Sequence, residues 1–170
     1  MGMDEMKRLT ALAYELREDT VNMVVEGKGG HIGGDMSVMD ILVSLYFKEM
    51  NIDTKNQESA DRDRFILSKG HSVEAYYAVL AEKGFFPKDE VIHKFSKFGS
   101  PYIGHPNNKL PGIEMNSGSL GHGLPVAVGM ALAGKNGSQG LPGIYRYGRR
   151  GTGRRFGMGR RHGGFAVSSG

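Results

Sequence analysis

The composition of the chain changes abruptly at Lys135, and this change limits how much of the sequence can fold around a core. Residues 136–170 contain 11 glycines and seven arginines but no aspartate or glutamate, whereas residues 1–135 hold 15 Lys and Arg against 18 acids. A segment so rich in glycine and charge buries too little apolar surface to offset the entropy lost on ordering. We therefore predict a folded domain over residues 1–135 and a disordered Gly/Arg-rich tail over residues 136–170.

The composition also excludes several classes of protein. A chain of 170 residues can bury one sizeable core, and it contains no cysteine, which excludes disulfides, thiolate zinc sites and cysteine nucleophiles. No apolar run approaches the roughly 18 residues of a membrane span, and the N-terminal residues lack the pattern of a signal peptide. We expect a cytoplasmic protein that does not insert into a membrane.

Apolar spacing predicts two helices near the N-terminus. One face of a helix over residues 5–26 carries five apolar side chains: Met6, Leu9, Leu12, Leu16 and Met23. The stretch 27–34 is predicted to be a loop because glycine weakens regular structure. Ser37 and Asp40 resemble a capping box for a second helix over residues 38–50, which turns Met39, Leu42, Leu45 and Tyr46 inward.

The rest of the first part alternates between strand, loop and helix. Residues 65–67 read as a buried parallel strand, residues 73–83 and 88–95 as helices, and residues 101–116 as a loop. A last helix over residues 125–133 is almost entirely small and apolar, so we expect it to be buried on every side. This alternation predicts an α/β fold with an open sheet, whose ligands collect at the carboxyl ends of the strands.

Three histidines lie beside glycines in predicted loops: His31 in GGHIGG, His71 in SKGHS and His105 in IGHPN. Histidine donates or accepts hydrogen bonds and changes protonation near neutral pH, which would suit a polyhydroxylated, phosphorylated substrate. Each alone could equally be a capping residue. A zinc site is a poorer interpretation, since zinc ligands usually occur a few residues apart. His93 is predicted to lie on a helix surface, and His122 either caps a helix or faces the site.

The segment Gly118 to Gly123 leads into a helix and would present backbone N–H groups to an anion. It is only a loose relative of the known phosphate loops, because no Lys-Ser/Thr pair follows it. Alone, it is a weak indication of phosphate binding.

The series GGHIGG, DRFILSKGHS, GHPN and MNSGSLGHGLPVAVGMALAGK, in this order, resembles the transketolase family, especially members whose N-terminal half is a separate short polypeptide. The resemblance covers residues 5–135. It implies an incomplete thiamine-diphosphate-binding fold, a parallel sheet flanked by helices, and transfer of a two-carbon ketol unit from a ketose phosphate to an aldose phosphate. By resemblance, His31, His71 and His105 are catalytic, and His71, Gly118 and Leu120 contact the cofactor.

The same resemblance implies partners and a metal. Transketolases act as homodimers or heterotetramers and need a C-terminal half or subunit, and their thiamine diphosphate is bound through magnesium. The family's next motif, Gly-Asp-Gly at the end of a strand, supplies oxygen ligands for that magnesium. No acid follows Glu114 in this chain, so we assign no metal ligand.

A shifted reading frame explains both the missing motif and the unusual tail. Reading the last two bases of each codon with the first base of the next, residues 147–158 permit Met-Gly-Asp-Gly-Glu-Leu-Ala-Glu-Gly-Ser-Val-Trp, and residues 140–146 permit Asp-Tyr-Arg-Val-Tyr-Thr-Val. One extra nucleotide near Lys135 would produce this shift. We expect the resulting chain to be inactive alone, with unpaired edges where an inner strand is lost.

Two alternatives remain from the sequence. Deoxyxylulose-phosphate synthase and dihydroxyacetone synthase, which also use thiamine diphosphate, share parts of the histidine pattern. The tail could instead be an Arg/Gly segment that binds nucleic acid by charge, a reading that would make the recovered frame a coincidence.

Overall fold

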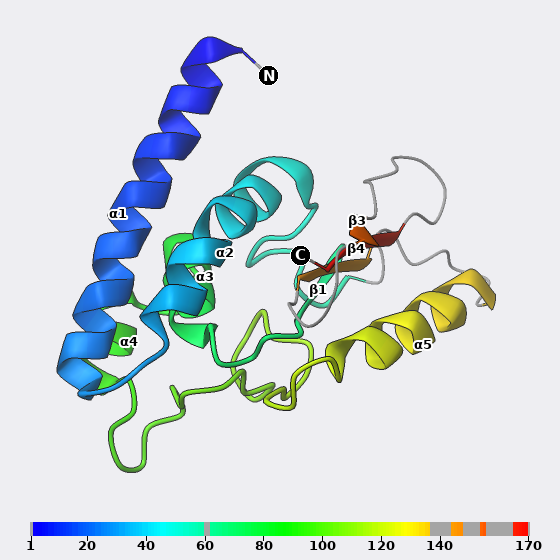
Figure 1. The fold of residues 1–170 in the computed structure, drawn as a ribbon. Helices are drawn as coiled ribbons and strands as arrows, with labels where there is room; N and C mark the ends of the chain where they lie inside the picture. The colour runs from blue at the N-terminus through cyan, green and yellow to red at the C-terminus, as the bar shows by residue number, and fades with distance from the viewer. Residues whose placement is uncertain (1, 60–61, 137–143, 148–153, 156–164, 170) are drawn as a thin grey trace. The chain divides into compact units, whose positions relative to one another are not determined.

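A computed structural model describes residues 2–59, 62–136, 144–147, 154–155 and 165–169 (Figure 1). The chain divides into two compact units. The first contains residues 1–50 and 71–105, and the second contains residues 51–70 and 106–170. All three histidines singled out in the sequence therefore belong to the first unit.

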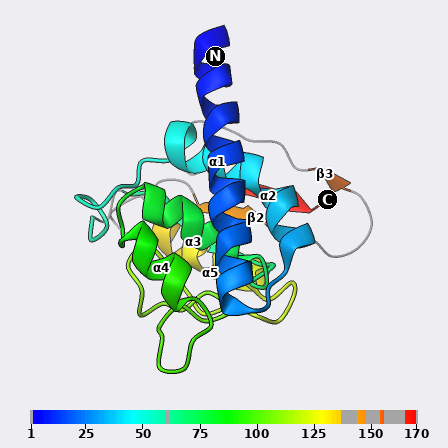
Figure 2. The same ribbon diagram turned by 90° about the vertical axis from the view of Figure 1, so that its left-hand side faces the viewer.

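The first unit is helical. It contains α1 (Met3–Gly27), α2 (Ile32–Ser44), a π-helical turn η1 (Leu45–Glu49), α3 (Val73–Glu82) and α4 (Lys88–Lys94). Helix α1 packs against α2, α3 and α4, and α2 also packs against α3 (Figure 2). The inward residues predicted for the second helix, Met39, Leu42, Leu45 and Tyr46, are all buried, which confirms that part of the prediction.

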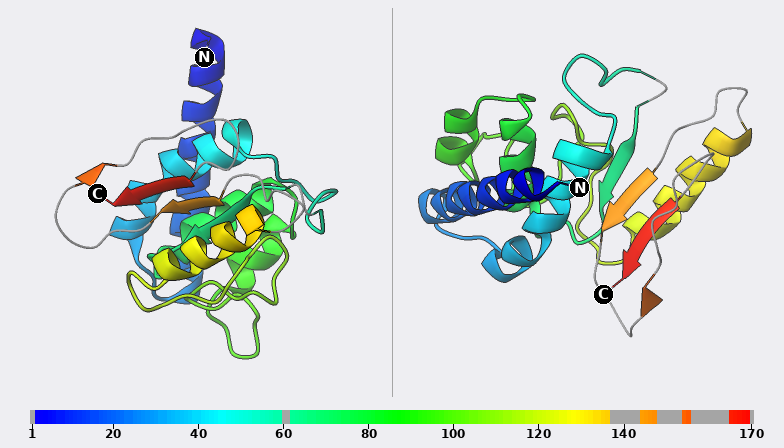
Figure 3. Two further views of the ribbon diagram at one scale, coloured as in Figure 1. Left: turned by 90° about the vertical axis from the view of Figure 1, so that its right-hand side faces the viewer. Right: turned by 90° about the horizontal axis from the view of Figure 1, so that it is seen from above.

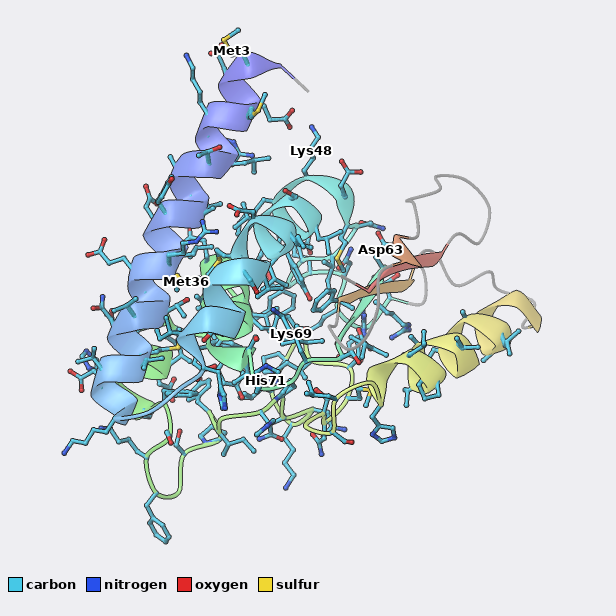
Figure 4. The ribbon with its side chains drawn as sticks, in the orientation of Figure 1. Met3, Met36, Lys48, Asp63, Lys69 and His71 are labelled. Carbon is cyan, nitrogen blue, oxygen red and sulfur yellow. The ribbon has the colours of Figure 1, made fainter. Side chains whose placement is uncertain are left out.

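The amphipathic face of α1 is confirmed except at its start. Leu9, Leu16 and Met23 are buried, Leu12 is only half-buried, and Met6 is exposed. The first turns of α1, which begin at Met3 (labelled in Figure 4), extend beyond the other helices of this unit, so an apolar side chain there gains no cover.

The glycine-rich stretch is only partly a loop, and this prediction was wrong for its second half. Helix α2 begins at Ile32 and includes Gly33 and Gly34, with His31 as its N-cap. A Cβ atom at Gly34 would collide with Ser72 Oγ, so glycine is needed there for close packing. The predicted capping box is also wrong, because Ser37 Oγ donates to the Gly34 carbonyl oxygen (2.9 Å) from inside the helix.

The second unit contains β1 (Arg64–Leu67), α5 (Gly123–Asn136), β2 (Ile144–Tyr147), β3 (Arg154–Arg155) and β4 (Phe165–Ser169). The strands lie in the order β1-β2-β4-β3 (Figure 3). β1 pairs in parallel with β2, with Arg64 opposite Ile144, and β2 pairs in parallel with β4. β3 is antiparallel to β4.

Two expectations for the second unit differ from the structure. The loss of an inner strand was expected to leave unpaired edges, yet residues 144–147 pair in parallel with β1. Ladder hydrogen bonds use main-chain groups that every sequence provides. Helix α5 was expected to be buried on every side, yet Leu124, Val128 and Leu132, spaced four apart, are exposed along one face. Ala127 is buried against Ile66 on another face.

The disorder predicted for residues 136–170 falls largely on residues 137–143, 148–153, 156–164 and 170, which lie outside the described residues. It therefore stays a prediction. Within the described part of the chain, no helix combines the length and apolar character needed to cross a membrane.

Candidate functional site

His31 is held by its backbone at the start of α2. Its N–H group donates a hydrogen bond to Glu74 Oε1 (3.2 Å). Its carbonyl oxygen accepts from the N–H groups of Gly34 (2.9 Å) and Asp35 (3.1 Å), as expected for the residue that opens a helix. The imidazole makes no capping bond, and the residue is exposed, so its side chain is available to a ligand.

His71 immediately precedes Ser72, the N-cap of α3. Its side chain, labelled in Figure 4, is half-buried. A Cβ atom at Gly34 would lie 3.5 Å from His71 Nε2, an ordinary van der Waals distance, so Gly34 lies next to this ring. The two Gly-His motifs are thus neighbours in space.

His105 is positioned by Tyr77, a fully buried residue of α3. The carbonyl oxygens of Ile103 and His105 each lie 3.1 Å from the Tyr77 hydroxyl, which donates to them. Burial raises the pKa of Tyr77 well above its ordinary value, and the nearby Glu74 raises it further. The hydroxyl therefore stays protonated and remains a donor. The bond holds the backbone of His105, and the His105 side chain is exposed.

The three imidazole rings converge within the first unit. The ring centroids of His31 and His71 are 5.2 Å apart with an edge-on interplanar angle of 65°, and those of His31 and His105 are 6.4 Å apart. Residues separated by tens of positions in the sequence are thus neighbours in space. Together they offer up to six ring nitrogens that can bind hydroxyl or phosphate oxygens and transfer protons.

Two buried acids near these rings were missed by the sequence analysis. Asp35 and Glu74 are both fully buried, the first on α2 and the second on α3. Burial raises the pKa of Glu74, an effect that hydrogen bonds from its own N–H group and from the His31 N–H group partly oppose. A signal was available, because each acid interrupts an otherwise apolar helix face.

Gly118 and Leu120, the other predicted cofactor contacts, lie in the second unit ahead of α5. Gly118 is exposed and Leu120 is half-buried. The preceding Ser117 is buried and donates through Oγ to the Leu67 carbonyl oxygen at the end of β1 (2.8 Å). A Cβ atom at Gly70 would lie 2.6 Å from Ser117 Oγ, so this loop and the end of β1 fit closely.

The two other histidines among the described residues, His93 and His122, are both exposed. His93 is exposed on α4, as predicted. His122 is exposed in the turn before α5. In the part of the chain that the structure describes, no three His, Cys, Asp or Glu side chains are arranged to hold a metal ion.

Comparison with known proteins identifies the family of this chain. The sequence model described as "Transketolase, thiamine diphosphate binding domain" matches residues 9–141, which include all five predicted site residues. Among curated proteins, an apulose-4-phosphate transketolase subunit from Phocaeicola vulgatus is 45% identical over 131 residues, covering 77% of this chain and 46% of the relative.

Two further matches agree. A Clostridium protein named 6-deoxy-6-sulfo-D-fructose transketolase subunit SqwG is 46% identical over 122 residues, covering 71% of this chain and 44% of the relative. The crystal structure of transketolase from Campylobacter jejuni superposes with a TM-score of 0.80 at 30% identity, over 89% of this chain and 24% of that one.

The chain spans less than half the length of these curated relatives. The family match nevertheless covers most of the chain and contains the histidine cluster. This protein belongs to the transketolase family, and the matched segment is the family's thiamine-diphosphate-binding domain.

Proposed function

We propose that this chain is the N-terminal part of a transketolase, which moves a two-carbon ketol unit from a ketose phosphate to an aldose phosphate. One observation carries the proposal: the rings of His31, His71 and His105 meet within the family-matched segment. Three imidazoles, none of them fully buried, can orient sugar hydroxyls and hold a proton near a carbonyl oxygen.

The imidazoles of His31, His71 and His105 are chemically suited to the reacting end of thiamine diphosphate. His71 would contact both cofactor and sugar, and His31 and His105 would bind hydroxyl groups of the sugar. Gly118 exposes backbone for a close approach, and Leu120 would lie against the cofactor. When bound, thiamine diphosphate supplies the carbanion chemistry, whereas the protein binds, orients and moves protons.

The metal end of the cofactor site does not fit this chain. Magnesium prefers carboxylate and carbonyl oxygens, and no acid follows Glu114 in the sequence. We therefore assign no residue to magnesium and propose that the chain in this form is inactive alone.

We attribute the missing ligands to one extra nucleotide near Lys135. The family match stops at residue 141, and the shifted frame over residues 140–158 permits a strand followed by Gly-Asp-Gly. Sequencing the gene across the Lys135 codon should show one base more than the related genes carry. An uninterrupted frame in independent reads, with no such insertion, would refute this explanation.

The exposed face of α5 supports a partner protein. Leu124, Val128 and Leu132 form an apolar stripe, a kind of surface that proteins usually cover by association. Relatives are themselves named as subunits of transketolases. We propose that a C-terminal half or subunit completes the enzyme as a homodimer or heterotetramer in the cytoplasm. We also propose that the second unit contributes to a parallel α/β sheet.

A chimera tests the proposed function. Residues 1–135 would be joined to the remainder of the Phocaeicola vulgatus relative and coexpressed with the polypeptide that pairs with it. We expect ketol transfer between sugar phosphates. His31→Ala, His71→Ala and His105→Ala should each reduce kcat/KM by about a hundredfold, since each removes a proton-transferring or orienting group.

His93→Ala is the matched control, because His93 is also an exposed histidine of the first unit but lies on α4. It should leave kcat/KM unchanged. A soluble, associated chimera whose three histidine variants retain the parent's kcat/KM would contradict the assignment of the site.

A further inference from the structure

At the N-termini of α2 and α3, an acid of each helix accepts a hydrogen bond from the backbone at the start of the other. Glu74 lies in the first turn of α3, and its Oε1 accepts from the His31 N–H at the start of α2 (3.2 Å). Asp35 lies in the first turn of α2, and its Oδ1 accepts from the Ala75 N–H in α3 (3.2 Å). Each helix thus provides the acid that binds a backbone donor of the other.

This exchange replaces ordinary capping. The first N–H groups of a helix have no partner within the helix and are usually satisfied by the side chain of its own N-cap. The N-caps here, His31 and Ser72, make no side-chain capping bond. The acids also lie where the positive end of the helix dipole favours negative charge.

The two acids are buried, so water does not compete for their hydrogen bonds. Both residues have 0% exposure. A Cβ atom at Gly30 would lie 2.5 Å from Glu74 Oε1, which shows how tightly the backbone before His31 fits over this carboxyl group. A buried carboxylate that loses its donor is costly, and so is a buried donor that loses its acceptor.

The exchanged hydrogen bonds connect the two histidines most closely in contact. Glu74 binds the backbone of His31 itself, and Asp35 binds α3 four residues after His71. The ring centroids of these histidines are 5.2 Å apart. We propose that Asp35 and Glu74 are positioning residues that hold the N-termini of α2 and α3 together and so set the placement of the His31 ring against the His71 ring.

This inference deepens the proposed function, since the rings it places are the proposed catalytic groups, but its test does not depend on activity. The 170-residue chain would be studied by NMR, with nuclear Overhauser contacts between the His31 and His71 ring protons as the readout. Glu74→Ala should abolish these contacts and shift both histidine resonances. Glu74→Gln should retain them, because its amide oxygen can still accept from His31.

Asp40→Ala is the matched control, because Asp40 is an acid of the same helix as Asp35 whose ion pair with Arg17 is exposed. It should leave the ring contacts intact. Retained contacts in Glu74→Ala would overturn the proposal, and so would their loss in a folded Glu74→Gln chain. Neither outcome changes the ketol-transfer result expected for the chimera's histidine variants, so the positioning proposal and the proposed function can fail independently.

A second measurement covers the case in which Glu74→Ala does not fold. In the unmodified chain, the His31 amide should exchange its hydrogen at least about tenfold more slowly than in an unstructured peptide, because its donor is bound to a buried carboxylate. Exchange of this amide at the unstructured rate would overturn the proposal.

Discussion

Replacing Tyr77 by alanine should lower the free energy of unfolding of the first unit by about 3–5 kcal/mol. Tyr77 is fully buried, and its ring meets those of Phe86, Phe95 and Tyr102 at centroid distances of 6.1, 6.3 and 5.9 Å. Truncation would leave a cavity among three aromatic rings that cannot all move inward. Urea denaturation followed by circular dichroism measures the loss.

Tyr77→Phe separates the ring from the hydroxyl. It keeps the aromatic packing and removes only the donor to the carbonyl oxygens of Ile103 and His105, so it should cost about 1 kcal/mol. The same variant should broaden or shift the His105 resonances, because the loop that carries His105 loses its anchor. An alanine variant as stable as the phenylalanine variant would contradict this account of the core.

Glu114→Ala is expected to destabilise the second unit by about 3 kcal/mol. The Glu114 carboxylate forms an ion pair with Arg62 and another with Arg64 (3.3 Å), and its side chain is only 7% exposed. Removing the acid leaves two partly buried guanidinium groups beside β1 without their counter-charge. The midpoint of urea denaturation should fall accordingly.

The exposed pair formed by Glu90 and Lys94 on α4 provides the comparison. Glu90→Ala should cost about 0.5 kcal/mol or less, because solvent screens such pairs. Similar losses from Glu90→Ala and Glu114→Ala would show that burial of the Glu114 pair is energetically unimportant.

Local patterns predicted most of the helices, but not the start of α2, which begins at Ile32 instead of residue 38. The period of apolar residues located α1 to within two residues, and the short apolar run at residues 65–67 located β1 to within one. The left-handed Gly84 (φ 85°) after α3 also follows from local chemistry. These features depend on neighbours along the chain, which the sequence displays directly.

Features that depend on distant neighbours were missed. Gly33 and Gly34 looked like a loop because the close approach of α2 to Ser72 at Gly34 is not visible locally. Asp35 and Glu74 were missed because an acid is normally solvated, and here each accepts a hydrogen bond from a donor about 40 residues away. The three histidines were singled out by the glycines beside them, but only the family resemblance assigned them to one site, since no spacing rule brings residues 31, 71 and 105 together.

We propose that the chain carries the histidine end of a transketolase cofactor site but not its metal end. Isothermal titration calorimetry with thiamine diphosphate and magnesium tests it most directly, using the 170-residue chain and the coexpressed chimera in parallel. We expect saturable binding to the chimera and no heat of tight binding to the 170-residue chain. Tight binding by the 170-residue chain, or no binding by a folded and assembled chimera, would contradict it.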